Sequence, residues 1–126
     1  MKKEVLSTPN APAAVGAYSQ AIRANGFIFV SGQLGMDPAT GALAGASAAD
    51  QARQALRNVA AILAAAGSGM ERVVKCTVLL VTIDDFAAVN EEYARFFPAE
   101  PPARAAYAVG KLPRDAMVEI EAIALA

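Results

Sequence analysis

The chain has 126 residues, of which 56% are apolar, and its formal net charge is −1. This length suits one domain with a core of its own, so we expect a single domain over residues 1–126. A net charge near zero provides no basic field to attract phosphates, and nucleic acid is therefore not favoured as a partner. The absence of histidine removes most zinc sites, catalytic triads and imidazole-based proton transfer, and the single Cys76 cannot form an intrachain disulfide.

The N-terminal lysines are not followed by an apolar segment of the kind found in secretion signals. No window of the sequence reaches the roughly 18 apolar residues that a membrane span requires. We therefore expect a cytoplasmic protein that does not associate with membranes.

The first predicted element is a β-hairpin centred on Asn25-Gly26, which favours a type I′ turn because both turn positions need positive φ. The hairpin strands are predicted over 18–24 and 27–33, with an additional strand over 3–7. The second hairpin strand is apolar on both faces, with Phe27 and Phe29 on one face and Ile28 and Val30 on the other.

A helix is predicted next over 47–66, with Ser47 as its N-cap and Gly67 as its C-terminal stop. Its apolar residues recur at helical spacing, namely Ala52, Ala55, Leu56, Val59, Ile62, Leu63 and Ala66. A strand over 73–81 follows, in which alternation predicts one wholly apolar face made by Val74, Cys76, Val78 and Leu80. Cys76 is therefore expected to be a buried packing residue.

A second helix is predicted from Asp84 to just before Pro98. Its inner face is formed by Phe86, Val89, Tyr93, Phe96 and Phe97. Two strands, 104–109 and 117–125, close the chain around a turn at 110–115. This order predicts an α+β fold with one mostly antiparallel sheet and two helices on one face. Because the other face stays uncovered, we expect a homo-oligomer built sheet against sheet.

Arg104 is a lone charge in the stretch "PPARAAYAV", with no acidic residue within three positions on either side. One interpretation is an exposed charge at a strand end, or a structural bridge to Glu119 or Glu121. The other is a clamp for a substrate carboxylate, which suits the planar fork of a guanidinium. The second interpretation implies a small anionic substrate.

Glu119 and Glu121 alternate with apolar residues in "AMVEIEAIALA", so both are predicted on the sheet face assigned to the oligomer. Such glutamates are usually solvated or paired with a cation. If one were partly buried at a subunit boundary its pKa would rise, as a general acid/base near neutral pH requires. Spacing alone does not choose between these two roles.

Three further segments carry polar candidates. Tyr18 follows Gly16 at the mouth of the hairpin, and Ser31 and Gly32 lead into a turn-rich loop. Asn90 lies at the edge of the inner face of the second helix. From the residues alone, Tyr18 is better explained as a core or interface packing residue, and Asn90 as a surface residue, than either is as a ligand-binding residue.

Four stretches in this order and spacing resemble the reactive intermediate (enamine/imine) deaminase A family, also called the YjgF or liver perchloric-acid-soluble-protein family. They are "APAAVGAYSQAI", "FVSGQLGMDPATG", "VVKCTVLLVTIDDFAAVNEEY" and "PARAAYAVGKLPRDAMVEIEAIA". The resemblance implies a chorismate-mutase-like fold and a homotrimer whose sheets line a central barrel, with three clefts between subunits.

The resemblance also implies an activity, the hydrolysis of 2-imino acids, derived from 2-aminoacrylate or 2-aminocrotonate, to 2-oxo acids and ammonia without a metal or cofactor. Arg104 matches the arginine that holds the substrate carboxylate, Glu119 the glutamate that positions or activates water, and Tyr18 the cleft tyrosine. The remaining substrate-binding positions implied by the motif match are Ser31, Gly32, Asn90 and Ala106, the last standing where many members have cysteine.

Two other functions remain open. Some members of that family have been described as endoribonucleases or translation inhibitors, an activity that the net charge of −1 and the lack of histidine disfavour here. A non-catalytic trimer that binds small ligands or acts as a chaperone would keep the same clefts.

Overall fold

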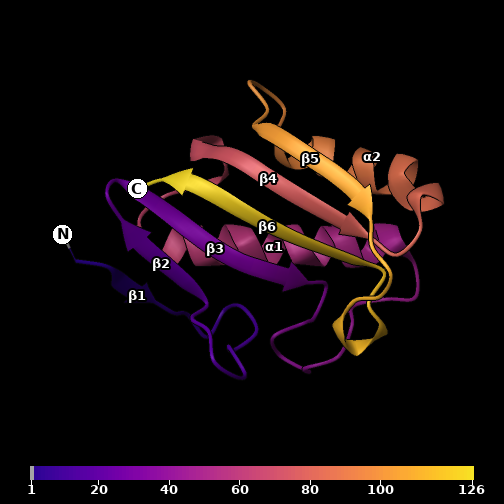
Figure 1. The fold of residues 1–126 in the computed structure, drawn as a ribbon, viewed down its shortest axis with the longest axis horizontal. Coiled ribbons are helices and arrows are strands. Elements are labelled where there is room, and N and C mark those ends of the chain that lie inside the picture. The colour runs from indigo at the N-terminus through magenta and orange to yellow at the C-terminus, as the bar shows by residue number, and fades with distance from the viewer. Residues whose placement is uncertain (1) are drawn as a thin grey trace.

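The computed structural model describes residues 2–126, which form a six-stranded sheet and two α-helices (Figure 1). The strands are β1 (Glu4–Leu6), β2 (Ala21–Ala24), β3 (Phe27–Leu34), β4 (Val73–Leu80), β5 (Ala103–Ala108) and β6 (Val118–Leu125). The helices are α1 (Ala48–Ala65) and α2 (Phe86–Phe96), and three single 3₁₀ turns occupy Met70–Arg72, Ile83–Asp85 and Pro113–Asp115.

The sheet is mixed, with strand order β1-β2-β3-β6-β4-β5. Every neighbouring pair is antiparallel except β4 and β5, which run parallel and are joined by α2, because parallel neighbours need a crossover connection. Figure 1 shows both helices behind the sheet, on the same face. The predicted α+β class with two helices on one face is confirmed, and the sheet is antiparallel apart from this one pair.

The predicted hairpin forms around Asn25 and Gly26, whose φ angles of 51° and 82° are the positive values of a type I′ turn. The first hairpin strand is shorter than predicted, since β2 begins at Ala21 rather than at Tyr18. Beyond the Ala21–Val30 pair, Ser31 still bonds to the preceding segment, its amide to the Gln20 carbonyl at 3.1 Å and its hydroxyl to the Ser19 carbonyl at 2.6 Å.

Helix α1 matches its prediction at both ends. The Ser47 Oγ accepts a hydrogen bond from the Asp50 amide at 3.1 Å. Gly67 has φ +79°, and the Ser68 amide donates to the Leu63 carbonyl at 2.8 Å, as in a Schellman motif. All seven predicted inward-facing residues are buried against the sheet.

One face assignment in β4 is wrong. Val73 is buried at 6% exposure and Val74 is 37% exposed, because the register with β6 shifts between Val73 and Lys75. One extra residue at a bulge reverses the side-chain alternation before it. After the bulge the prediction is confirmed, and Cys76 is buried.

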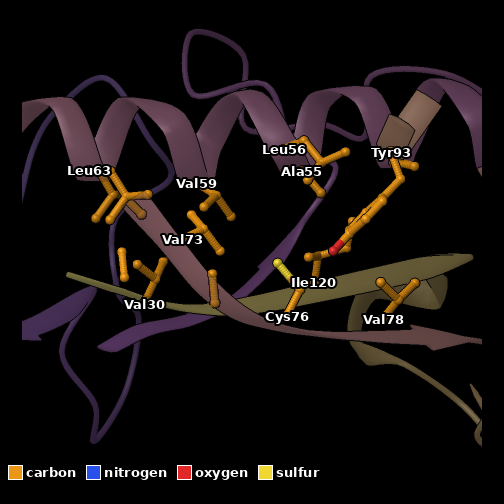
Figure 2. Close-up of a cluster of buried hydrophobic side chains, with 14 of the residues drawn as sticks. Val30, Ala55, Leu56, Val59, Leu63, Val73, Cys76, Val78, Tyr93 and Ile120 are labelled. Carbon is orange, nitrogen blue, oxygen red and sulfur yellow. The ribbon is translucent and has the colours of Figure 1, made fainter. Parts of the chain in front are cut away.

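The apolar core lies between the helices and the sheet, as Figure 2 shows for Leu56, Cys76 and Ile120. The opposite sheet face has no helix over it within residues 2–126 (Figure 1). Phe29 is 43% exposed there, and its ring lies 6.3 Å from that of Phe27. This apolar face is the one that the sequence assigns to an oligomer. No helix in residues 2–126 combines the length and apolarity needed to cross a bilayer.

Candidate active site

A cleft of about 570 Å³ opens beside the bulge in β3. Four of the predicted site residues line it together: Tyr18, Ser31, Gly32 and Glu119. The lining also includes Glu121 and Arg114, so that two acidic residues and one basic residue line the same space. This set of groups suits a small polar ligand.

The bulge at Ser31-Gly32 shapes the cleft. The β3–β6 register moves from Val30 opposite Ala122 to Gln33 opposite Ile120, which leaves Ser31 and Gly32 out of regular pairing with β6. The Ser31 hydroxyl donates to the Ser19 carbonyl at 2.6 Å. The hydroxyl proton is therefore already used in a hydrogen bond, whereas the hydroxyl oxygen can still accept one from a ligand.

Because Gly32 has no side chain, the Glu119 side chain can lie directly over its Cα. A Cβ at position 32 would be 2.3 Å from the Glu119 Oε2, closer than real Cβ contacts come. Glu119 is only partly buried. Burial raises the pKa of its carboxyl above the ordinary value of 4.5, and the nearby Glu121 charge adds to the rise. The group thus moves toward the range in which a carboxylate serves as a base near neutral pH.

We expect Gly32→Ala to lower activity more than it lowers stability, because the new methyl group must push the Glu119 carboxyl aside. Activity that depends on Glu119 should fall by about tenfold or more, since a displacement of about 1 Å can cost on the order of 100-fold in rate. The matched control is Gly26→Ala, where a Cβ meets nothing within 4 Å but φ is +82°. That variant should lose stability through backbone strain and keep its specific activity. The reverse pattern in melting and rate measurements would contradict the placement of Glu119.

Tyr18 stands at the rim of the cleft, 52% exposed, and its hydroxyl accepts a hydrogen bond of 3.4 Å from the Val15 amide. The segment before it is fixed by the buried Gln20, a residue that the sequence analysis missed. The Gln20 amide donates to the carbonyls of Thr8 and Pro12 at 3.2 and 2.9 Å and accepts from the Thr8 amide at 2.8 Å. No spacing pattern reveals this role, because its partners are backbone atoms of an irregular loop.

Arg114 is a second cleft residue that the sequence analysis missed. The turn predicted at 110–115 contains the 3₁₀ turn Pro113–Asp115. Arg114 is the middle residue of that turn and lines the cleft. The Arg114 backbone has φ 62°, a left-handed value that is uncommon for residues other than glycine. Its Nη2 donates to the Gly41 carbonyl at 3.1 Å. A lone arginine in a turn carries no signal of such a position.

Arg104 lies outside this cleft, on the face of the sheet that carries the helices. It pairs in register with Cys76 of β4, whose side chain points into the core. Its Nη1 donates to the Asn90 Oδ1 of α2 at 2.7 Å. Ala106 follows two residues along β5 on the same face and packs partly against the core.

The structure therefore divides the predicted residues into two groups, which we call the glutamate half site (Tyr18, Ser31, Gly32 and Glu119) and the arginine half site (Asn90, Arg104 and Ala106). Glu119 is opposite Leu79 in the register with β4, whereas Arg104 is opposite Cys76. Side chains of successive strand residues point to opposite faces. Glu119 and Arg104 thus lie on opposite faces of one chain, and the alternative of a structural bridge from Arg104 to Glu119 or Glu121 is wrong within it.

Comparisons with known proteins cover nearly the whole chain. The family model described as Endoribonuclease L-PSP matches residues 8–126. A rat protein named 2-iminobutanoate/2-iminopropanoate deaminase is 53% identical over 123 residues, covering 98% of this chain and 90% of the relative. A solved structure of an Entamoeba histolytica protein described as an endoribonuclease L-PSP superposes with a TM-score of 0.96 at 47% identity, covering 99% and 100% of the two chains. The structure of Escherichia coli TdcF with bound serine superposes with a TM-score of 0.93 at 40% identity, covering 98% of each chain.

Proposed function

Because the chain belongs to the endoribonuclease L-PSP family, we propose that it is a 2-iminobutanoate/2-iminopropanoate deaminase, which hydrolyses reactive 2-imino acids to 2-oxo acids and ammonia. The observation that carries the proposal is the partly buried Glu119 carboxyl at the cleft beside the β3 bulge, in a chain 53% identical to a relative of that name. Binding of serine by TdcF supports a small amino-acid-like ligand. The substrate class is therefore a 2-imino acid with a short side chain.

The proposed reaction adds water across the C=N bond. The Glu119 carboxylate accepts a proton from a water molecule as the water oxygen attacks the imine carbon, and the protonated Glu119 carboxyl then donates that proton to the nitrogen, which gives a carbinolamine. Glu119 next accepts the carbinolamine hydroxyl proton and returns it to the nitrogen, so that the C–N bond breaks, ammonia leaves and the C=O bond of the 2-oxo acid forms. An imine carbon is already electrophilic, so positioning and about 10²-fold to 10⁴-fold from proton transfer account for the catalysis without a metal or cofactor.

The division into two half sites requires a second copy of the chain. One subunit supplies the glutamate half site and the next supplies Arg104, which binds the substrate carboxylate with its planar fork of donors. A homotrimer with a chorismate-mutase-like arrangement and a central barrel meets this requirement and covers the exposed Phe27 and Phe29. One domain over residues 1–126 and a cytoplasmic location complete the proposal.

We expect a stable trimer in sedimentation, and we expect two inactive variants to restore each other when assembled together. Arg104→Ala and Glu119→Gln each destroy one half site. When the two variants are refolded together in equal amounts, about half of the subunits carry an intact Glu119 and the other half an intact Arg104. About one quarter of the interfaces then combine an intact glutamate half site with an intact arginine half site, so about a quarter of the parental activity should return. A monomer in sedimentation, or no recovery from mixed trimers, would contradict the shared site.

The activity is tested by coupling the purified protein to an amino-acid dehydratase that releases 2-iminobutanoate and following the formation of 2-oxobutanoate. We expect the 2-oxo acid to form faster than with the dehydratase alone. Cleavage of RNA without that acceleration would favour the endoribonuclease alternative, and binding of 2-oxobutanoate without acceleration would favour a non-catalytic trimer that binds small ligands.

A further inference from the structure

The arginine half site contains more than its arginine. Three residues of α2, at spacings of four and then three, form a stripe on one face of the helix: Phe86, Asn90 and Tyr93. The Arg104 Cζ lies 5.2 Å from the centre of the Phe86 ring and 4.8 Å from that of Tyr93. Asn90, between them in the helix, accepts the hydrogen bond from the Arg104 Nη1. All three therefore contact the same guanidinium.

We propose that Phe86, Asn90 and Tyr93 are positioning residues that hold the Arg104 guanidinium ready to bind a carboxylate. The inference deepens the proposed function and rests on it. It also changes the role expected of Asn90, which acts through Arg104 and not on the substrate. The Asn90 Oδ1 engages one N–H of the guanidinium, so four of the five N–H groups remain for a ligand.

The need for such support follows from the position of Arg104. It projects from β5, which is one of the two edge strands of the sheet, and is exposed. An arginine side chain has several rotatable bonds, and ordering it on ligand binding costs conformational entropy. A side chain that is already ordered before binding does not lose this entropy again, so the ligand binds more tightly. Aromatic rings attract a guanidinium without using its N–H donors. The rings can therefore restrict Arg104 while its donors stay available.

Tyr93 connects this support to the core. Its side chain is only 4% exposed, and its ring packs 4.8 Å from that of Phe97. Figure 2 shows Tyr93 extending from α2 toward the sheet, where Cys76 and Ile120 lie. The Tyr93 hydroxyl is buried beside the Cys76 thiol and makes no hydrogen bond to Arg104. Since the hydroxyl is not needed to contact Arg104, we assign the positioning role to the ring.

This assignment predicts different KM values for three variants. Tyr93→Phe keeps the ring and should keep the parental KM. Tyr93→Leu keeps an apolar residue but removes the ring, and should raise KM by about tenfold while changing kcat much less, because the clamp binds substrate and transition state alike. Phe97→Leu is the matched control: it removes a buried ring from the same cluster that does not contact Arg104. It should lose as much melting temperature as Tyr93→Leu and keep its KM.

A direct readout does not depend on turnover. The ¹⁵N relaxation of the Arg104 Nε–H group should report an ordered side chain in the parent, Tyr93→Phe and Phe97→Leu proteins and a mobile one in Tyr93→Leu and Asn90→Ala. A mobile Arg104 together with a raised KM in Tyr93→Leu supports the inference. Unchanged order and unchanged KM in Tyr93→Leu overturn it, as does an equal rise of KM in Phe97→Leu.

Failure of the proposed deaminase activity can be distinguished from failure of the positioning role. A parent protein that does not accelerate imine hydrolysis would refute the deaminase, whereas the order of Arg104 in the same variants would still show whether the α2 stripe holds it. In that case, weaker binding of 2-oxobutanoate by Tyr93→Leu than by Phe97→Leu would support the inference, and equal binding would overturn it.

Discussion

Replacing Arg104 by alanine is expected to abolish imine hydrolysis and the binding of 2-oxobutanoate, with the oligomer and its melting temperature nearly unchanged. A 2-imino acid offers one strong handle, its carboxylate, and the guanidinium fixes both the position and the plane of that group. Loss of a charged hydrogen-bond partner costs about 1.5 to 3 kcal/mol, which is about one to two decades in affinity. Misplacement of the attacking water adds to this loss.

Arg104→Lys is expected to lose most of the activity as well, since an ammonium group fixes a distance but not a plane. Although the sequence offers Arg104 no neighbouring acid, the structure gives it a bond to Asn90 and two ring contacts. These contacts lie at an exposed side chain, so we expect little change in folding.

Arg95→Ala provides the matched control for these measurements. Arg95 is an arginine of α2 whose side chain is 71% exposed and lies 3.6 Å from Glu92, outside both half sites. It should keep its activity. If Arg104→Ala dissociated the oligomer while the remaining protein still hydrolysed imine at the parental rate, Arg104 would be structural and the clamp assignment would be wrong.

Glu119→Gln is expected to lower kcat by about 10²-fold to 10⁴-fold, the usual contribution of a general base, with little effect on the binding of 2-oxobutanoate. Glutamine keeps the shape of the side chain over Gly32 but cannot accept the proton of water. Glu121→Gln is the matched control on the same sheet face and at the same cleft, and should lower kcat much less. Equal losses in the two variants would mean that the wrong acid was assigned or that both are structural.

The raised pKa of Glu119 also predicts how activity depends on pH. The carboxylate form is the base, so kcat/KM should rise as the pH rises through a pKa above 4.5. Because the Glu121 charge contributes to that raised pKa, Glu121→Gln should lower it and move the acid limb of the pH profile to lower pH. A limb that stays in place would exclude this coupling.

The same shift affects folding stability. Burial favours the protonated form of Glu119 in the folded state, so the folded state loses stability as the pH rises through the raised pKa. Glu119→Gln, which cannot ionise, should therefore melt at a higher temperature than the parent near neutral pH. The difference should disappear below the ordinary glutamate value, where the parent side chain is protonated in both states. Thermal melts across that pH range measure it.

The sequence by itself determined the features whose causes lie within a few residues. Asn25-Gly26 fixes the hairpin because few other pairs accept two positive φ angles. Ser47 and Gly67 set the ends of α1 through local hydrogen bonds. The alternation in β6 places Glu119 on the free face, since Val118 and Ile120 must both be buried.

The sequence also distinguished candidate residues without locating them relative to one another. The resemblance to a family drew attention to Arg104 and Glu119 together, but no local pattern states that Arg104 lies on the face opposite to that of Glu119. The register of β5 with β4 pairs Arg104 with the buried Cys76 and thereby places it on the helix side of the sheet. This placement depends on contacts between distant segments.

Only the tertiary structure decided the features that depend on contacts between distant segments. The bulges after Val73 and Val30 arise from register against β6, which no alternation within one strand can reveal. Gln20 and Arg114 reach backbone carbonyls at Thr8 and Gly41, and such partners leave no trace in residue type. Local chemistry thus determines which elements form, whereas the site depends on strand order and register, which are set by burial of the whole sheet against its two helices.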